Sequence, residues 1–560
     1  MNWIRLDYTV KSVVRSGVTV SIEEVRTAAM SILHKIGSVA IVCLAGLLLP
    51  IQVSAEPIVP IRSWQFHELD VDYVTHALTE TAKYDINTVV YSHGMIGAVS
   101  DLYKSKDRSD KLRKLAREAH SRDLKVWIWI HELENDVPKK YLDGKTVQMD
   151  RPGFWDWLTA KYDKLFVDYP EFDGIMLTFH ETKYKLFDKK DVNSSLSMPE
   201  RFTKLINTID DVCSKYNKDF VVRSFLYEPQ EMKWFEDGVK NIHPRVMLQS
   251  KCVPHDWEPY YPNNPMIGMF PNRKLIVEFD CSSEFTGKNR VPYTSPDYFE
   301  RRWRYDLAQP GVVGYNARLD HGGYDALYTP NEINIYTLYR LTQDPAVTAR
   351  DIWHEWTEKR YGSKAAPFVE KALRPSFDVI NKSFFTLEFW ITKHSAVPSF
   401  SYATSHLSSR TIAKWRPGEP YYRKMELQLN HPTPVLLEQI LAEKDQAIAM
   451  ADQSLFWLNK AKPILQPYQY DDLYWRLELM RRVATVWKLH AEAFYGYRTL
   501  QEGHNVPGLY QRVQRAIQGL YEQAKVSETA GIIKTPPASA SEIRKAADEL
   551  DSKLHKTSPF

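Results

Sequence analysis

The sequence predicts an α/β fold in which a (β/α)8 TIM barrel is followed by an all-helical domain. From residue 58 onward, short apolar runs alternate with amphipathic stretches, as parallel strands joined by helical crossovers require. Eight such runs occur, at residues 58–64, 88–92, 124–130, 174–179, 220–225, 246–248, 275–279 and 312–316. Beyond Arg340 the strand pattern stops, and apolar residues recur at the spacing of packed helices. We therefore expect a catalytic barrel over residues 56–345 and a helical domain over residues 346–555.

Local signals agree with this alternation. A helical stretch before the fifth run begins with Pro199 and Glu200, residue types that the first turn of a helix favours. Residues 395–432 are dense in Ser, Tyr, Pro and Trp, and we expect an extended loop or short strands there. An open doubly wound sheet is the alternative fold, but eight strand–helix units are more than such a sheet usually has.

Charge and composition narrow the class of partner. The net charge is +3, from 73 basic and 70 acidic residues, so no strong basic field predicts nucleic-acid binding. Aromatic residues make up 13% of the chain and include 16 Trp and 32 Tyr, which leaves rings available for stacking on sugars. We expect an oligosaccharide or polysaccharide partner, and a homodimer through the helical domain is a further interpretation.

The N-terminal part of the chain has the pattern of an export signal. Residues 36–54 form an apolar run that closes in a small-residue pattern ending at Ala55. This pattern predicts a signal peptide with an N-terminal extension over residues 1–55, cleavage after Ala55, and an exported protein that starts at Glu56. The alternative is an uncleaved membrane anchor, although Pro50 and Gln52 interrupt the run before a full bilayer span.

Cysteine usage argues against a disulfide framework and a metal centre. Beyond the signal only Cys213, Cys252 and Cys281 remain. The last two end neighbouring strand runs and could pair or stay free. Since no CxxC or His-rich spacing occurs, we expect no metal site and no cofactor.

The predicted strand ends gather ionisable residues. In a (β/α)8 barrel the active site lies at the C-terminal ends of the strands. The residues there are His93, His131, Glu132, Glu134, His180, Glu181, Arg223, Tyr227, Glu228, Lys251, Asp256, Glu278, Glu284, Arg318, Asp320 and His321, with Trp257 beside Asp256. Carboxylates beside aromatic rings fit glycosidic bond cleavage, in which one acid protonates the leaving oxygen and another handles water or the anomeric carbon. The simpler interpretation is that acids at strand ends cap loops.

Several segments carry a family resemblance. These are QSKCVPHDWEP at 249–259, FPNRK at 270–274, VEFDCSSEFTG at 277–287, GVVGYNARLDHGG at 311–323, and the helical stretch that follows. In order and spacing they resemble glycoside hydrolase family 67, the α-glucuronidases that remove glucuronic or 4-O-methylglucuronic acid from xylan fragments. The resemblance covers roughly residues 126–362.

The resemblance implies roles for individual residues. Asp256 and Glu284 fall where that family places the two carboxylates that activate water, and Glu181 falls at or next to its general acid. Arg223 and Lys251 match positions that hold the substrate carboxylate, a task that suits a guanidinium or ammonium group. We expect His180, Trp257, Glu278 and Asp320 to complete the binding site.

Two departures from the family stand out. A lysine expected on the fourth strand is Thr178 here, which removes one cationic partner of a uronic acid. Only a few residues separate the signal from the first strand, so the family's N-terminal β-domain is not expected. The chain therefore resembles a shortened or distant relative.

These observations predict a secreted, inverting, α-glucuronidase-like hydrolase of a plant or algal glycan. Three rivals remain. The first is a retaining glycosidase of different sugar specificity that uses Glu181 as acid and Glu278 as nucleophile. The second is a non-catalytic carbohydrate-binding protein. The third is a lyase acting on uronic acids, with His131, His180 or Tyr227 as base.

Overall fold

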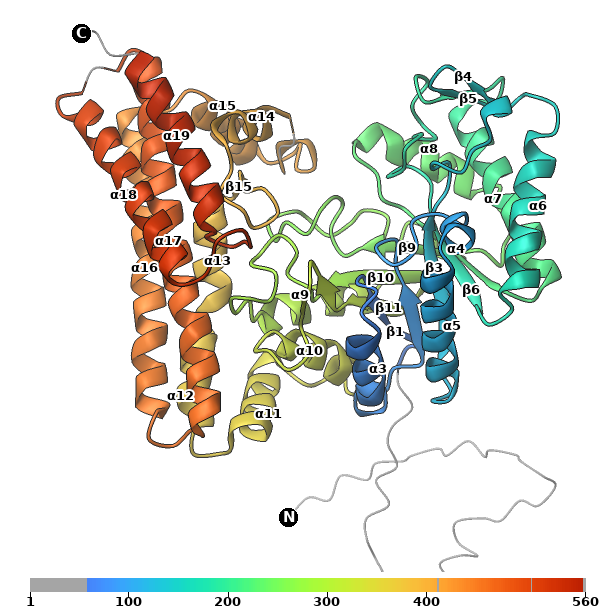
Figure 1. Ribbon diagram of the computed structural model, residues 1–560, viewed down its shortest axis with the longest axis horizontal. Coiled ribbons are helices and arrows are strands. Elements are labelled where there is room, and N and C mark those ends of the chain that lie inside the picture. The colour runs from blue at the N-terminus through green and yellow to red at the C-terminus, as the bar shows by residue number, and fades with distance from the viewer. Residues whose placement is uncertain (1–57, 410–411, 505, 557–560) are drawn as a thin grey trace, which may run out of the picture. The chain divides into compact units, whose positions relative to one another are not determined.

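A closed barrel of eight parallel strands forms the first half of the structure (Figure 1). The computed structural model describes residues 58–409, 412–504 and 506–556. Around the barrel the strand order is β1-β11-β10-β9-β8-β6-β3-β2. The strands are β1 Ile61–Phe66, β2 Thr88–Tyr91, β3 Lys125–His131, β6 Gly174–Thr178, β8 Asp219–Arg223, β9 Met247–Lys251, β10 Leu275–Asp280 and β11 Val312–Arg318. Each overlaps one of the eight runs expected from the sequence, so the barrel prediction is confirmed.

Helices connect most of the strands. They are α3 Val71–Glu80, α4 Asp101–Lys104, α5 Lys106–His120, α6 Phe154–Asp168, α7 Met198–Lys215, α8 Pro229–Val239, α9 Pro296–Leu307 and α10 Glu332–Gln343. Helix α7 begins as the sequence indicates, because Ser197 and Glu200 form a capping box and a proline occupies the first turn. Between β9 and β10, residues 252–274 form a long loop with no helix. Long loops inside compact domains are often functional, and this one carries Asp256.

Three small sheets add to the barrel and were not expected from the sequence. Strands β4 Leu142–Asp143, β5 Thr146–Gln148 and β7 Val192–Asn193 form one of them. β12 Asp320–His321 pairs with β13 Tyr324–Asp325, and β14 Phe385–Thr386 pairs with β15 Phe389–Trp390. Strands of two or three residues are too short to show the alternation of apolar and polar residues that identifies a strand.

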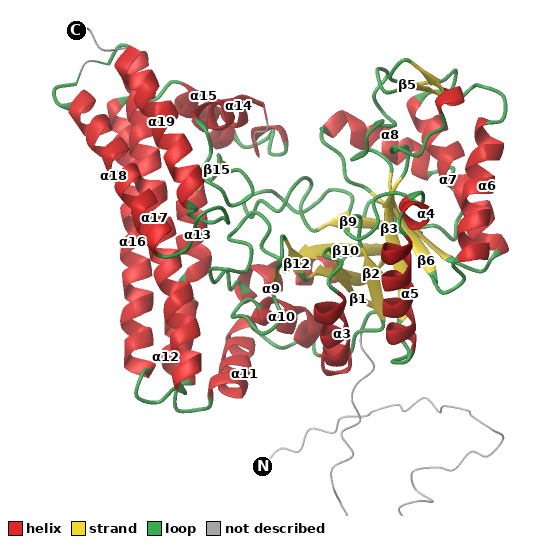
Figure 2. Cartoon of the chain, in the orientation of Figure 1, coloured by secondary structure: helices red, strands yellow, loops and turns green. Residues whose placement is uncertain are grey.

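Apart from β14 and β15, the regular structure in the remainder of the described chain is helical (Figure 2). Its helices are α11 Ala349–Tyr361, α12 Ala366–Leu373, α13 Ser376–Phe384, α14 Phe400–Ser409, α15 Pro420–Asn430, α16 Pro434–Ala461, α17 Pro467–Gln501, α18 Leu509–Thr529 and α19 Ala540–Lys556. The long helices α16 and α17 pack against each other along the bundle. The expectation of loop or strand over residues 395–432 was wrong, because α14 and α15 lie there. Helix α14 buries Ala403 and Leu407, so tertiary packing overrides the polar composition of this stretch.

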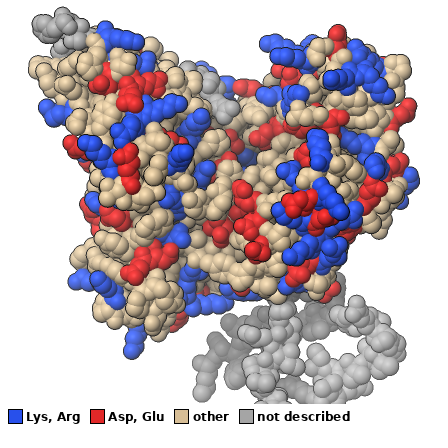
Figure 3. Space-filling view, in the orientation of Figure 1, with Lys and Arg blue, Asp and Glu red and all other residues tan. Residues whose placement is uncertain are grey.

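Residues Pro57–Phe560 form one compact unit. The predicted domain boundary at residue 345 falls between α10 and α11 and stays a prediction. The predicted signal segment lies outside the described residues. Within the described ranges, no helix is both long and apolar enough to cross a membrane. Basic and acidic side chains are interspersed over the face of the molecule seen in Figure 3, in agreement with the low net charge.

The barrel interior divides into two layers. Nearer the N-terminal ends of the strands it is apolar, with a cluster of Val90, Trp127, Trp129, Met176, Val221, Met247 and Ile276. Nearer the C-terminal ends, the inward-facing side chains are polar and joined by hydrogen bonds. Asn316 Nδ2 donates to Gln65 Oε1 over 2.7 Å and to Gln249 Oε1 over 3.3 Å. Gln249 Nε2 in turn donates to Glu278 Oε2 over 3.1 Å. This polar layer lies directly beneath the candidate site.

Candidate active site

A cavity of about 240 Å³ opens at the C-terminal ends of the strands. Its lining is dominated by charged groups, imidazoles and aromatic rings. The lining residues are the acids Glu181, Asp256, Glu258 and Glu284, the cations Arg223, Lys251 and Arg318, the histidines His67, His93, His321, His394 and His406, and the rings Trp129, Phe225, Tyr227, Phe285, Trp390 and Tyr402. The three predicted catalytic acids and both predicted cations therefore meet in one cavity.

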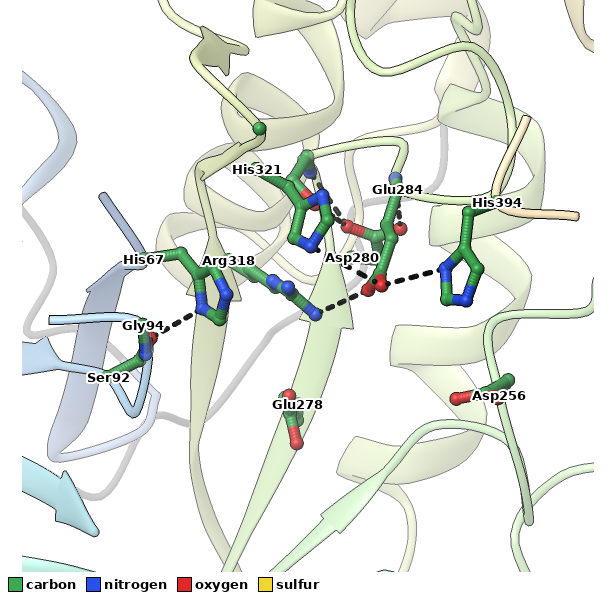
Figure 4. Close-up of polar contacts among 12 residues, drawn as sticks. His67, Ser92, Gly94, Asp256, Glu278, Asp280, Glu284, Arg318, His321 and His394 are labelled. Carbon is green, nitrogen blue, oxygen red and sulfur yellow. Dashed lines mark hydrogen bonds and ion pairs between the residues drawn. The ribbon is translucent and has the colours of Figure 1, made fainter. Parts of the chain in front are cut away.

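Glu284 has contacts with Arg318, His321 and His394 (Figure 4). Its Oε2 lies 2.7 Å from Arg318 Nη1, and its Oε1 lies 3.5 Å from His321 Nε2 and 3.3 Å from His394 Nδ1. Burial raises the pKa of Glu284, but Arg318, the hydrogen bond from His394 and the nearby His321 together hold it well below its usual value. Glu284 therefore stays ionised at neutral pH.

The turn after β10 aims Glu284 into the cavity. The amide nitrogen of Glu284 donates to Asp280 Oδ2 over 3.1 Å, and Ser282 donates to Asp280 Oδ1 through its amide over 2.9 Å. Between them Ser283 adopts a left-handed conformation with φ of 52°. The side chain of Asp280 thus closes a tight turn by accepting these backbone hydrogen bonds, and the turn fixes the direction of the Glu284 side chain.

Asp256 is held separately from Glu284, by groups on and after β9. Lys251 Nζ lies 2.9 Å from its Oδ1, and His255 Nδ1 lies 3.7 Å from its Oδ2. Burial raises the pKa of Asp256, but Lys251 and then His255 outweigh burial and lower it. The cavity consequently holds two ionised carboxylates, each with its own cationic partner.

Glu181 is the most open of the three predicted catalytic acids. It follows β6, and its side chain is 39% exposed. Its Oε2 accepts a hydrogen bond from Arg223 Nη1 over 3.3 Å. Arg223 also lies over the ring of Trp129, with 4.4 Å between the guanidinium carbon and the ring centroid. Glu181 can therefore reach a ligand in the cavity while keeping contact with a cation.

Glu278 lies beneath the cavity and does not line it. Its side chain is 0% exposed, and its oxygens accept from Arg223 Nε over 2.7 Å and from Arg223 Nη2 over 3.3 Å. Burial raises its pKa, but the charge of Arg223 more than offsets this and keeps it low. Glu278 therefore holds Arg223 in place from below, and its full burial leaves it no access to a sugar in the cavity.

Three more of the predicted binding residues surround the cavity without lining it. His180 Nε2 lies 2.9 Å from Glu231 Oε1. The ring of Trp257 lies under Lys251 Nζ, 4.4 Å from the ring centroid. Asp320 is buried, and its two oxygens accept from the backbone amides of residues 67 and 68 over 2.7 and 2.9 Å. These side chains position the loops and cations of the site.

Sequence reasoning missed the contribution of the helical region. Trp390, His394, Tyr402 and His406 line the cavity, although they follow Glu284 by more than 100 residues in the printed sequence. Ser395 fastens this segment to the barrel, because its Oγ accepts from the amide of Gly287 over 2.8 Å and donates to the carbonyl of Glu284 over 3.0 Å. No periodicity or short motif signals such a long-range contact.

A row of histidines forms the wall made by β1, β2 and β11. The ring of His67 lies 4.6 Å from that of His93 and 5.0 Å from that of His321, and His67 Nδ1 lies 2.6 Å from Ser92 Oγ. Burial, and after it the charge of Arg318, lowers the pKa of His67 to about 2 and that of His321 to about 4. This wall is therefore uncharged at neutral pH and can exchange hydrogen bonds with hydroxyl groups.

The thiols stand apart from this chemistry. Cys213, Cys252 and Cys281 are buried and free, which settles the question left open for the last two. Burial raises the pKa of Cys252 to about 12, so its thiol is protonated at neutral pH. Within the part of the chain that the structure describes, no three His, Cys, Asp or Glu side chains are grouped to hold a metal ion.

Solved structures with a similar fold exist, although the sequence comparisons found no match. No family model matches the chain, and no curated protein matches it. It is similar to a solved GH138 enzyme targeting pectin rhamnogalacturonan II, with a TM-score of 0.58 and 12% identity over 88% of this chain and 63% of that one. It is also similar to a mutant O-GlcNAc hydrolase of Thermobaculum terrenum, with a TM-score of 0.45 and 12% identity over 89% and 95% of the two chains. The chain thus shares the fold of the GH138 enzyme, a glycoside hydrolase, while spanning less than two thirds of its length.

Proposed function

We propose that the chain is a glycoside hydrolase that removes a terminal uronic acid from an oligosaccharide or polysaccharide, with inversion at the anomeric carbon. One observation carries the proposal. A single cavity holds Glu181, which is partly exposed, together with the ionised carboxylates of Asp256 and Glu284. An inverting glycosidase needs this division of tasks, a proton donor and a separate carboxylate that activates water.

The residues divide the reaction as follows. Glu181 donates its proton to the glycosidic oxygen as the bond to the anomeric carbon breaks. Glu284, assisted by Asp256, accepts a proton from the water whose oxygen bonds to that carbon from the opposite face. Arg318 and the hydrogen bond from His394 keep Glu284 ionised and oriented. Glu284 can be a weak base, because the positive charge at the anomeric carbon in the oxocarbenium-like transition state already attracts the water oxygen.

The cations support an acidic substrate. Lys251 and Arg223 line the cavity, and each is already bound to a site carboxylate. A uronic acid carboxylate would share these donors, since an ammonium or guanidinium group can serve more than one oxygen. The resemblance to family 67 favours glucuronic acid, and the GH138 enzyme of similar fold makes pectic fragments a second class to test.

Glu181→Gln and a substrate panel test the reaction. Glucuronosyl, galacturonosyl, glucosyl and galactosyl substrates are compared, and the anomer first released is followed by NMR. Glu181→Gln should lower turnover by about 10²–10⁴-fold, and a substrate with an excellent leaving group should be spared because it needs no protonation. Asp211→Asn, a change at an exposed carboxylate of α7, is the matched control and should leave the rate unchanged.

The outcomes separate the parts of the proposal. Release of neutral sugars alone, unaffected by Arg223→Ala, would contradict the uronic acid specificity and leave a glycosidase. A retained anomer would contradict the water-activating roles of Asp256 and Glu284. Absence of any hydrolysis, with an unsaturated uronate absorbing in the ultraviolet, would instead make the chain a lyase.

Export belongs to the same proposal, since a polysaccharide substrate lies outside the cell. The apolar segment and the small residues before Glu56 support it. N-terminal sequencing of the protein recovered from the cell envelope or medium should give Glu56 as the first residue. A chain that keeps residues 1–55 would contradict cleavage at this position.

A further inference from the structure

We propose that a second cavity beside the active site binds the leaving-group side of an acidic oligosaccharide, an inference that rests on the proposed glycosidase function. This side cavity has a volume of about 1040 Å³ and is lined by residues of the β6–α7 connection, α7, α8 and the segment before α8. Its aromatic and cationic lining includes Lys185, Phe187, Lys189, Tyr227 and Trp234.

The side cavity adjoins the catalytic cavity at the general acid. Tyr227 lines both cavities, and His180, which lines the side cavity, immediately precedes Glu181. In the proposed reaction Glu181 protonates the oxygen that leaves with the remainder of the glycan. The sugar units attached to that oxygen therefore lie on the Glu181 side of the site, where the side cavity begins.

The side cavity offers ring faces to sugar units. Trp234 is partly exposed and packs edge-on against Phe187, with 5.7 Å between ring centroids. One face of Tyr227 is covered by Lys185 Nζ, 4.5 Å from the ring centroid, so Trp234 provides the open ring. A ring that is packed on one side and open to the cavity on the other can stack on the C–H face of a sugar at little entropic cost.

The wall that carries the lysines is fixed in place. Arg201 is buried, and its guanidinium donates to the backbone carbonyls of Leu186, Val192 and Leu196 over 3.3, 3.0 and 3.1 Å. These bonds span the segment that follows β6 and includes β7. The wall is therefore already ordered before a ligand arrives, which lowers the cost of binding.

Two lysines of the side cavity can pair with an anion. The four acids of the lining already have hydrogen-bond donors: Asp188 accepts from the amide of Lys190, Glu200 from Ser197, Glu228 from Lys414, and Glu231 from His180 and the amide of Tyr227. Lys185 and Lys189 also line the cavity, and neither ammonium has an ion pair within the described residues. Two cations without ion pairs, beside stacking rings, suit a glycan that carries carboxylates.

Calorimetry with an inactivated chain tests this site apart from catalysis. Short oligogalacturonides and their carboxyl-reduced, neutral counterparts are titrated into the Glu181→Gln chain, with and without Lys185→Met plus Lys189→Met. The lysine changes should weaken binding of the acidic ligand by about tenfold and leave the neutral one unchanged, and added salt should diminish the difference. Trp234→Ala should weaken both ligands by about tenfold. Lys233→Met, an exposed neighbour on α8 that pairs with Asp237, is the control.

A second measurement separates this inference from the proposed function. In the otherwise unaltered chain, Trp234→Ala should raise KM for oligosaccharides and leave hydrolysis of an aryl uronide unchanged, because the aryl group is too short to occupy the side cavity. If the aryl uronide is cleaved but neither Trp234 nor the lysines affect oligosaccharide binding, this inference is wrong and the proposed function stands. If no substrate is cleaved, calorimetry still decides whether the side cavity binds an acidic glycan.

Discussion

The two halves of the barrel interior are built on opposite principles. Nearer the N-terminal ends of the strands, the side chains form an apolar cluster in which Val90, Met176 and Ile276 are fully buried. Nearer the C-terminal ends, the same strands bury Gln249, Glu278 and Arg223 in a hydrogen-bonded network. A buried ion pair contributes little net stability, because desolvation offsets the attraction, whereas buried apolar groups stabilise directly. Groups that stabilise the barrel and groups that support the site are therefore concentrated at opposite ends of the strands.

Removing one partner of the buried ion pair should have the largest effect. Glu278→Leu leaves Arg223 buried without its main counterion, and we expect a loss of about 3–5 kcal/mol in the free energy of unfolding. The double variant Glu278→Leu with Arg223→Met should recover most of this loss but remain inactive, because Arg223 lines the cavity. Urea unfolding followed by fluorescence measures both. If the double variant is as unstable as Glu278→Leu alone, the polar layer stabilises the fold itself, and the idea that it serves mainly function is wrong.

The same pair predicts the direction of an acid effect. The folded-state pKa of Glu278 lies below its ordinary value, so its ionised form stabilises the fold above that value. This contribution is lost as the pH falls through the lowered pKa. The double variant, which has no charge there, should lose less stability than the unaltered chain on acidification. Unfolding midpoints measured from neutral pH to well below 4.5, the ordinary pKa of this side chain, compare the two.

A change in the apolar layer should act on stability alone. Ile276→Ala removes buried carbons on β10 and should lower the free energy of unfolding by about 2–4 kcal/mol. Turnover at a temperature where the variant is folded should remain within twofold of the original, since Ile276 does not line the cavity and its cluster reaches the cavity only through Trp129. A large fall in turnover without loss of folded protein would mean that the layers are not separate.

The sequence predicts the strands and their ends well, for a physical reason. A buried parallel strand is a short apolar run, and its C-terminal end meets those of its neighbours, so local pattern and topology together place Glu181, Asp256 and Glu284 in one cavity. The roles of Glu278 and Asp320 could not be predicted, because the sequence pattern is the same for a carboxylate that faces the cavity and for one that supports a loop. The contact of His394 with Glu284 had no local signal. It depends on where the segment before α14 docks, and that is a property of the tertiary fold.

That contact gives the smallest and most specific prediction. His394 belongs to the helical region, its side chain is 51% exposed, and both it and Ser395 adopt left-handed backbone conformations, with φ of 46° and 67°. Glycine and asparagine tolerate this conformation, so His394→Gly removes the ring without added strain and His394→Asn restores a hydrogen-bond donor. Because the hydrogen bond from His394 helps to lower the pKa of Glu284, its loss should raise that pKa toward its usual value. In His394→Gly the acid limb of the kcat/KM profile should therefore move to higher pH, with about a tenfold loss of rate, or about 1.4 kcal/mol. His394→Asn should recover part of both effects. A uniform loss of rate at every pH would show instead that His394 only closes the cavity.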